Sequence, residues 1–528
     1  MIARRALAAV FAFAVSAPSA ADAFCGFYVS GADAKLTNDA TLVVLMRGGQ
    51  KTVLSMQNTY KGPPENFALV IPVPTVLQKD DVKTLPRALF DKVDQLGSPR
   101  LVEYWEQDPC APGVDSFGAG GLGLSGIGEG GGGKGGGIGL GSVKVEARFE
   151  VGEYEIVILS AKDSTGLDAW LRENKYKIPD GAEPHLRPYV QAGSKFFVAK
   201  VNVAKVKIEN GQALLSPLRF HYDSERVTLP IKLGLINSQG TQDLVVNILS
   251  NGTRYEAANY PNATIPTNLD VADATRTQFG AFYNALFDRT IAEHPRAVVT
   301  EYAWDSGSCD PCPGPTLDSG DLESLGRDVV GDAGAAKGGG LGLGGFGGMV
   351  LTRLHVRYGK ESLGEDLVFR AVAPIEGGRE PWGGPQKSGA HPAAANAFQA
   401  RYAIRHKWQG KITCDNPRHG VWGGPPRGDG GAWAPAPKPT AATRIAAQPR
   451  GGVQLASLLN ADFVEPPAPS AAAPSPSLVP PPSASAPSAP PRDSLGCFGC
   501  TTSARSSTWW ALVALAAPAI AVARRRRR

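Results

Sequence analysis

The chain has 528 residues, a formal net charge of +5, 63 glycines, 43 prolines and seven cysteines. Residues 1–23 hold +1 of that charge and residues 524–528 hold +5, so the remaining chain carries −1. Nucleic-acid binding requires clustered Lys and Arg that neutralise phosphates, and a body this close to neutrality gives it no support.

The first predicted element is a signal peptide over residues 1–23. Arg4 and Arg5 precede an apolar run, and Ala21-Asp22-Ala23 has the small-x-small pattern that signal peptidase accepts, so we expect cleavage after Ala23. Export makes disulfides the default state of cysteines. The disulfide candidates in the expected globular region are Cys25, Cys110, Cys309, Cys312 and Cys414. Because this set is odd in number, one cysteine is free or pairs elsewhere.

A repeated motif predicts two homologous halves, residues 24–204 and 205–415. Its first copy is Ala88-Leu89-Phe90-Asp91, then Glu103-Tyr104-Trp105 and a glycine-rich loop over 113–141. Its second copy is Ala285-Leu286-Phe287-Asp288, then Glu301-Tyr302-Ala303-Trp304 and a glycine-rich loop over 331–348. The order is the same in both, which is typical of an internal duplication.

The apolar pattern of both halves is mostly that of short strands bounded by turn formers. Strands are expected at 41–47, 52–58, 67–71, 144–150, 154–160, 241–250, 350–358 and 399–406. Gly152 predicts a tight hairpin turn, and helices are expected over 167–175, capped by Thr165 and Asp168, and over 274–293. The predicted fold is α+β and strand-dominated, with two antiparallel β-rich halves, few helices and bracing disulfides.

The composition of residues 416–493 predicts a Pro/Ala-rich linker or stalk. Within it, residues 465–492 consist almost entirely of Pro, Ala and Ser, which favours an extended chain of up to roughly 90 Å. Residues 494–528 combine a cysteine motif, an apolar segment and a basic tail, and this combination predicts a sorting signal or anchor. The residues that define it are Cys497, Cys500, Arg524, Arg525, Arg526, Arg527 and Arg528. The apolar run over 509–523 would rise about 22 Å as a helix, short of a hydrocarbon core of about 30 Å. A processed sorting signal is therefore favoured over a short permanent anchor.

No local pattern nominates catalytic residues, a metal site or a cofactor. The glycine-rich runs contain G-x-G-x-x-G matches, but they lack the strand-loop-helix context that binds phosphate. Cys309-Asp310-Pro311-Cys312 has the C-x-x-C spacing of dithiol oxidoreductases and zinc sites. The neighbouring prolines predict a rigid loop, so a structural disulfide is the favoured reading and redox chemistry the alternative.

Several sequence blocks resemble a known family. Tyr60-Lys61-Gly62, the run Phe67-Ala68-Leu69-Val70-Ile71-Pro72-Val73-Pro74 and the block Leu218-Arg219-Phe220-His221-Tyr222 resemble the domain-of-unknown-function family twenty-three-thirty, over residues 25 to 410 or so. This resemblance implies a secreted or surface-exposed bacterial protein and supplies no catalytic residues. The C-terminus resembles the MYXO-CTERM sorting tails of myxobacterial surface proteins. That resemblance implies a sorting protease acting near Cys497 or Cys500 and lipid attachment to one of them.

These features together predict an exported protein, tethered to a membrane at the cell surface or outer envelope by its C-terminal tail. The expected function is non-enzymatic: binding, adhesion or an envelope structural role, with a surface partner that the sequence does not identify. The alternative is an extracellular hydrolase, or a thiol oxidoreductase that uses Cys309 and Cys312.

Overall fold

The chain divides into two compact units, Met1–Pro466 and Pro467–Arg528. The computed structural model describes residues 27–29, 41–57, 68–110, 142–176, 178, 180–209, 212–237, 241–331, 348–359, 362–379, 388–426, 434–445 and 451–460, all in the first unit. These residues confirm the strand-dominated α+β fold with few helices.

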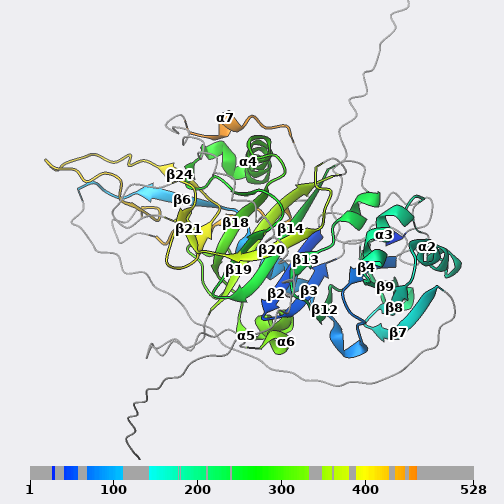
Figure 1. The fold of residues 1–528 in the computed structure, drawn as a ribbon. Coiled ribbons are helices and arrows are strands. Elements are labelled where there is room, and N and C mark those ends of the chain that lie inside the picture. Colours follow the sequence, from blue (N-terminus) through cyan, green and yellow to red (C-terminus); the bar gives the residue numbers. More distant parts are fainter. Residues whose placement is uncertain are drawn as a thin grey trace, which may run out of the picture. The chain divides into compact units, whose positions relative to one another are not determined.

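A large mixed sheet forms the centre of the described part (Figure 1). Its strand order is β22-β21-β23-β18-β19-β14-β2-β3-β12-β5, with β16 also paired to β18. The bounds are β2 Thr41–Gly48, β3 Lys51–Gln57, β5 Val82–Thr84, β12 Leu218–Asp223, β14 Gln242–Asn251, β16 Asn262–Thr264, β18 Val298–Asp305, β19 Met349–Tyr358, β21 Ile375–Gly377, β22 His391–Pro392 and β23 Ala397–Gln399. The sheet therefore takes strands from both predicted halves.

The pairing of β2 with β14 differs from the antiparallel expectation. Leu42 lies opposite Val245 and Val43 opposite Val246 in a parallel ladder. Parallel strands need a long crossover connection, and almost two hundred residues separate these two strands in the chain. The two predicted halves thus meet inside one sheet instead of each forming a sheet of its own.

A second sheet packs on one face of the central sheet. Its order is β1-β4-β9-β8-β7, with β1 Phe27–Val29, β4 Ala68–Val73, β7 Val143–Val151, β8 Tyr154–Ala161 and β9 Lys195–Val201. Its inner face contributes Ile156, Ile158 and Phe197 to a core shared with the central sheet, and the Phe197 ring stacks on Phe220 at 5.2 Å between centroids. Its outer face is covered by α2 Ser164–Glu173 and α3 Glu183–Gln191.

Two predictions concern this second sheet: the hairpin turn at Gly152 is confirmed, and the helix cap at Thr165 is not. Gly152 forms the turn between β7 and β8 with φ +56°, a left-handed conformation that favours glycine, so the predicted hairpin is confirmed. The predicted cap of the following helix is wrong. Helix α2 begins before Thr165, and the Asp163 side chain accepts a hydrogen bond from the Gly166 amide at 2.6 Å.

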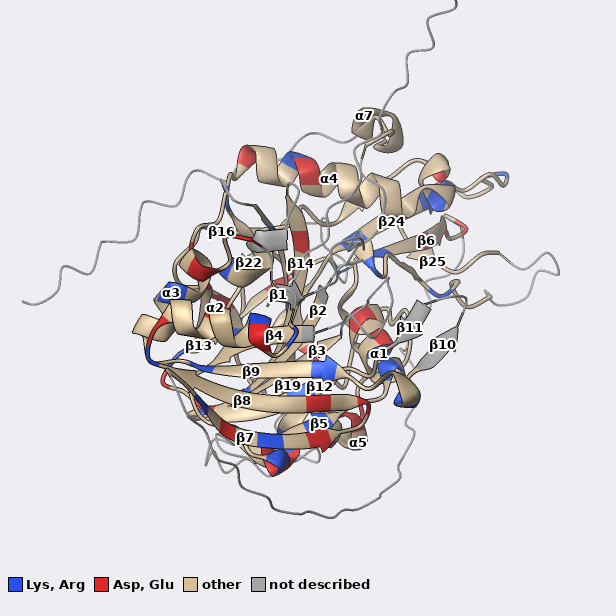
Figure 2. Cartoon of the chain, turned by 90° about the vertical axis from the view of Figure 1, so that its right-hand side faces the viewer, with Lys and Arg blue, Asp and Glu red and all other residues tan. Residues whose placement is uncertain are grey.

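Strand β7 is the edge of the second sheet. Figure 2 shows basic and acidic residues alternating along it, and Lys144, Arg148 and Glu150 are exposed. Charged side chains on an edge strand oppose pairing with another chain. This edge is therefore protected against β-sheet extension.

Helices α1 Arg87–Gly97 and α4 Phe279–Glu293 cover the other face of the central sheet. In both copies of the repeated motif the chain runs from one of these helices into a strand, α1 into β6 Arg100–Glu106 and α4 into β18. The partners differ, because β18 pairs with β19 whereas β6 pairs in parallel with β24 Arg401–His406. The motif has a common local structure, and the homology of the halves stays a prediction.

A third sheet contains β6, β24, β17 Leu269–Asp270, β25 Trp422–Gly423 and β26 Thr440–Ala441. In Figure 1, β6 and β24 lie side by side although about three hundred residues separate them. The short helix α7 Leu455–Leu458 packs near α4, and Ala442, Ile445 and Leu458 are buried with it. The fold thus extends past residue 415, into the segment predicted as linker, because a few scattered apolar residues suffice to hold it.

The remaining elements include a two-stranded sheet, β10-β11, and a three-stranded sheet, β13-β20-β15. They are η2 Lys79–Asp81, η3 Val203–Lys205, β10 Lys207–Glu209, β11 Gln212–Leu214, β13 Val227–Leu229, η4 Lys232–Asn237, β15 Arg254–Ala257, η5 Asp273–Thr277, α5 Ser319–Leu322, η6 Glu323–Arg327, α6 Asp328–Val330 and β20 Leu367–Val372. The helix predicted over 274–293 is divided between η5 and α4.

Four of the five disulfide candidates pair. Cys110 and Cys414 are bridged with their Cα atoms 5.5 Å apart and 304 positions apart in the chain. Cys309 and Cys312 are bridged to each other, three positions apart, in the loop after β18. The first bridge fastens the end of β6 to the loop that follows β24, so it braces the third sheet.

Several predicted features lie outside the described residues. They are Ala21, Ala23, Cys25, Cys497, Cys500, Arg524, Arg525, Arg526, Arg527 and Arg528, together with residues 113–141, 332–347 and 465–492. Among the residues that are described, no helix is long and apolar enough to span a membrane.

We predict that replacing Cys110 and Cys414 by serine lowers the free energy of unfolding by about 2 to 4 kcal/mol, because the bridge closes a long loop in the unfolded chain. Urea unfolding of the full chain measures it. The matched control replaces Cys309 and Cys312 by serine. The free energy of unfolding should fall less in this variant, because that bridge closes a short loop. Equal losses in the two variants would contradict this account.

Candidate functional site

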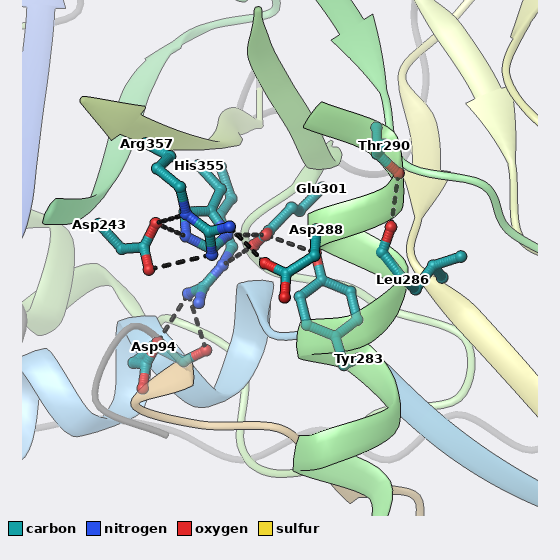
Figure 3. A network of polar contacts seen from close by, with 10 residues as sticks. Asp94, Asp243, Tyr283, Leu286, Asp288, Thr290, Glu301, His355 and Arg357 are labelled. Atoms are coloured by element: carbon teal, nitrogen blue, oxygen red, sulfur yellow. Dashed lines mark hydrogen bonds and ion pairs between the residues drawn. The ribbon is translucent and has the colours of Figure 1, made fainter. Parts of the chain in front are cut away.

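A cluster of buried charged side chains lies between the central sheet and the helices α1 and α4 (Figure 3). Three of its members, Arg353, His355 and Arg357, alternate along β19 and so lie on one face of that strand. The intervening Leu354 and Val356 face the opposite core, which the second sheet shares. The carboxylates come from other elements: Asp94 of α1, Asp243 of β14, Asp288 of α4 and Glu301 of β18.

Arg353 connects two carboxylates from different parts of the chain. Its Nε donates to Glu301 Oε2 at 2.7 Å and its Nη1 to Asp94 Oδ1 at 2.7 Å. The side chains of Arg353 and Glu301 are both 0% exposed. Removing one partner would leave the other charge buried without compensation, so the two sides of the contact depend on each other.

His355 lies between two further carboxylates. Its Nδ1 is 2.7 Å from Glu301 Oε1 and its Nε2 is 3.5 Å from Asp243 Oδ1. The Phe287 ring stacks on the imidazole at 3.7 Å between centroids. Tyr283 donates its hydroxyl to Glu301, which therefore has three side-chain partners.

The outer part of the cluster is Arg357. Its Nε donates to Asp243 Oδ1 at 2.8 Å, it pairs with Asp288, and its guanidinium lies 4.9 Å from the Phe287 ring centre. Figure 3 shows Arg357 between Asp243 and Asp288. The cluster thus joins β14, β18 and β19 to both helices.

The mutual contacts decide the protonation of the cluster. Burial alone would lower the pKa of His355, but the Glu301 and Asp243 carboxylates outweigh burial and raise that pKa above 6.5. Burial alone would raise the pKa of Glu301, but His355 and Arg353 outweigh it and lower the pKa to about 2. The contacts thus favour an imidazolium between ionised carboxylates.

This cluster is closed to substrates. Arg353, His355 and Glu301 are fully buried, and their principal charges are paired with one another. Within the described ranges, no group of three or more His, Cys, Asp or Glu side chains could hold a metal ion. The geometry is that of an internal ion network that positions α1 and α4 on the sheet, and we call it the buried ion network.

An open site lies at the far end of the third sheet. It is a groove of about 570 Å³ at the ends of β6 and β24, lined by Trp105, Glu106, Arg405, His406, Lys407, Trp408, Gln409, Gly410 and Pro426. We call it the tryptophan groove. Its lining combines the aromatic faces of two tryptophans with charged and polar side chains that could orient a ligand.

The aromatic side of the groove is held by a chain of contacts. His406 and Trp105 are cross-strand neighbours, and their rings stack at 4.5 Å between centroids. His406 Nε2 is 3.1 Å from Glu103 Oε2, and Arg276 makes two hydrogen bonds of 2.7 Å to the same carboxylate. Trp105 is therefore positioned before any ligand arrives.

The acidic residue of the groove already has partners. Glu106 accepts the backbone amides of Trp408 at 3.0 Å and Gly420 at 2.9 Å, and its Oε1 is 3.0 Å from His419 Nδ1. Burial alone would raise the pKa of Glu106, but these hydrogen bonds lower it. Glu106 thus stays ionised and shapes the loop that carries Trp408.

The sequence-predicted cysteine site lies elsewhere, beside α1. The loop between Cys309 and Cys312 is fastened by Arg100, whose Nη1 donates to the Pro311 carbonyl at 3.0 Å, and by Gln399, which donates to the Asp310 carbonyl. Sequence reasoning did not find the buried ion network or the groove. The alternation of Arg353, His355 and Arg357 within an apolar strand was a usable signal for the network. The groove had no such local signal, because Trp105 and Trp408 are about three hundred residues apart.

We predict that Arg353→Met lowers the free energy of unfolding by about 3 to 5 kcal/mol, because Asp94 would lose its buried counter-charge and Glu301 would keep only His355. Urea unfolding measures it. The control, Arg370→Met, breaks an exposed pair with Glu256 and should cost under about 1 kcal/mol. Similar costs in the two variants would show that the network contributes no more than a surface pair.

We predict that the contribution of His355 to stability depends on pH. Its folded-state pKa is raised above 6.5, so its contribution is complete below that pH and is lost as the pH rises through the folded-state value. The destabilisation caused by His355→Gln should therefore shrink between about pH 5.5 and about pH 9. Urea unfolding across this range, with the partly exposed His391→Gln as control, tests it. A pH-independent difference for His355→Gln would refute the assignment.

Comparison with known proteins identifies the family of the chain. A family model described as an uncharacterised protein conserved in bacteria (DUF2330) matches residues 19–370, which is more than half of the chain. The match ends within β20, so it contains Trp105 but not β24 or Trp408. No curated protein and no solved structure matches the chain. The chain belongs to this family of uncharacterised bacterial proteins.

Proposed function

We propose that the protein is a non-enzymatic binding protein displayed at the bacterial cell surface, with the tryptophan groove as its ligand site. The observation that carries this proposal is the contrast between its two polar sites. The central charges of the buried ion network, Arg353, His355 and Glu301, are paired and excluded from solvent, whereas the groove is open, aromatic and pre-positioned. Exposed aromatic residues held rigidly are characteristic of binding sites.

Display at the surface rests on sequence features and on the disulfides. The expected signal peptide ends at Ala23, and the tail from Cys497 to the terminal arginines resembles a surface-sorting signal. Two bridges, Cys110–Cys414 and Cys309–Cys312, favour an oxidising compartment outside the cytoplasm. In this proposal signal peptidase and a sorting protease process the chain, and the tail or a lipid attached there tethers it to the membrane.

Thiol–disulfide exchange at Cys309 and Cys312 is the second candidate function. These two cysteines pair with each other and both are partly exposed, which leaves their bridge accessible to a dithiol. Titration with a mild dithiol reductant, followed by mass spectrometry of the alkylated protein, distinguishes the candidates. Selective opening of this bridge while Cys110–Cys414 stays closed would favour redox chemistry.

The binding function is tested on whole cells. Deletion of the gene should reduce adhesion of cells to their substratum and to one another, and complementation with the native gene should restore it. Complementation with Trp408→Ala should not restore it, because the groove would lose an aromatic face. The matched control is Trp170→Ala, which removes a tryptophan that packs beside Tyr176 on the second sheet. Equal surface amounts of both variants must be verified with an antibody.

If deletion leaves adhesion and the composition of the cell surface unchanged, the binding proposal fails. Restoration by Trp408→Ala would keep a binding protein but remove the groove as its site.

A further inference from the structure

We infer that the tryptophan groove takes an acidic polysaccharide, a chain of sugar rings that carry carboxylates. This inference rests on the proposed binding function and names its ligand class. It follows from three properties of the groove: its fixed aromatic surfaces, the excess of exposed cations on the loop that borders it and its openness.

The aromatic surfaces are arranged to stack against flat, partly apolar rings. Trp105 and Trp408 are each only partly buried, so apolar ring surface remains in contact with solvent. A Cβ added to Gly410 would lie 2.4 Å from Trp408 Cζ2, so a larger residue at this position would displace the indole. A sugar ring presents C–H groups on its face and hydroxyls on its edge, which suits an amphipathic aromatic surface with polar neighbours.

The charge of the groove selects an anion. Its carboxylate, Glu106, already accepts three hydrogen bonds, and its Arg405 pairs with Asp270 through Nε at 2.8 Å. Lys407 is exposed in the groove, and no ion pair within the described ranges involves it. Two more exposed cations, Lys411 and Arg418, lie on the same loop, where Asp415 is the one acidic residue between positions 407 and 421. Counted with the ionised Glu106, the loop carries three cations against two carboxylates, and all three cations are exposed. A ligand with spaced negative charges would complement this loop.

The openness of the groove favours a polymer over a small enclosed molecule. The site lies at the end of a sheet, and its rim includes the exposed Lys407, Gln409 and Pro426. An acidic peptide would satisfy the charge, but it would not provide a repeating ring for each tryptophan. We therefore commit to the polysaccharide and make the peptide an outcome of the test.

The test uses the full chain, immobilised, with three probes: polygalacturonate as the acidic polysaccharide, dextran as the neutral one and polyglutamate as the acidic peptide. We expect polygalacturonate to bind at least about tenfold more tightly than either other polymer, and to weaken as NaCl rises from about 50 mM to about 300 mM. Trp408→Ala should abolish this binding and Lys407→Gln should weaken it severalfold. Lys205→Gln, which removes an exposed lysine that pairs with Glu150, is the charge-matched control.

Each other result overturns the inference in a distinguishable way. Equal binding of dextran, unaffected by Lys407→Gln, would assign a neutral glycan to the groove. Equal binding of polyglutamate, unaffected by Trp408→Ala, would reduce the site to a charged surface. Failure of all three polymers to bind, while cell adhesion still depends on Trp408, would overturn the ligand class and leave the proposed function standing. Thermal melting of each variant verifies that it is folded.

Discussion

The guanidinium of Arg353 lies wholly buried between Glu301 of the neighbouring strand and Asp94 of helix α1. Removing these charges from water is costly, and the cost is offset only if every partner is in place at once. Asp94 also accepts the Arg444 backbone amide at 2.8 Å, so the same network holds the segment that follows the third sheet. The placement of both helices, of three central strands and of this C-terminal segment therefore depends on one set of contacts.

The buried ion network and the tryptophan groove use the same residue types for opposite purposes. In the network, Arg and His side chains are paired with carboxylates and covered by Phe287. In the groove, His406 stacks on Trp105 and contacts Glu103, which pairs with Arg276, while Lys407 stays exposed. Burial and pairing give the network a structural role, whereas the groove is open and bordered by exposed cations, which are the properties on which its proposed binding role rests.

The sequence predicts where most of the strands lie, but it does not predict which distant strands pair with each other. Strands β2, β3, β7, β8, β14 and β19 lie within about two residues of their predicted ranges, since period-two apolar patterns depend only on neighbouring residues. The parallel pairings of β2 with β14 and β6 with β24 depend on crossover connections that no local pattern encodes. The groove could not be predicted for the same reason, because it combines residues of β6 with residues of the loop after β24, which are far apart in the chain. The cap of α2 was misplaced because T-x-x-D and the true Asp163 cap overlap within one helical turn.

The parallel pairing of β6 with β24 has a consequence for how the molecule reaches its folded state. A chain is synthesised from its N-terminus, so β6 emerges about three hundred residues before its partner strand exists. Pairings of such high sequence separation form slowly, and until then the apolar Leu101 and Val102 of β6 have no strand beside them. The third sheet, the bridge between Cys110 and Cys414 and the groove itself can thus be completed only after nearly all of the globular chain has been made. A protein with this topology therefore cannot complete its fold segment by segment during synthesis and closes its last sheet at the end.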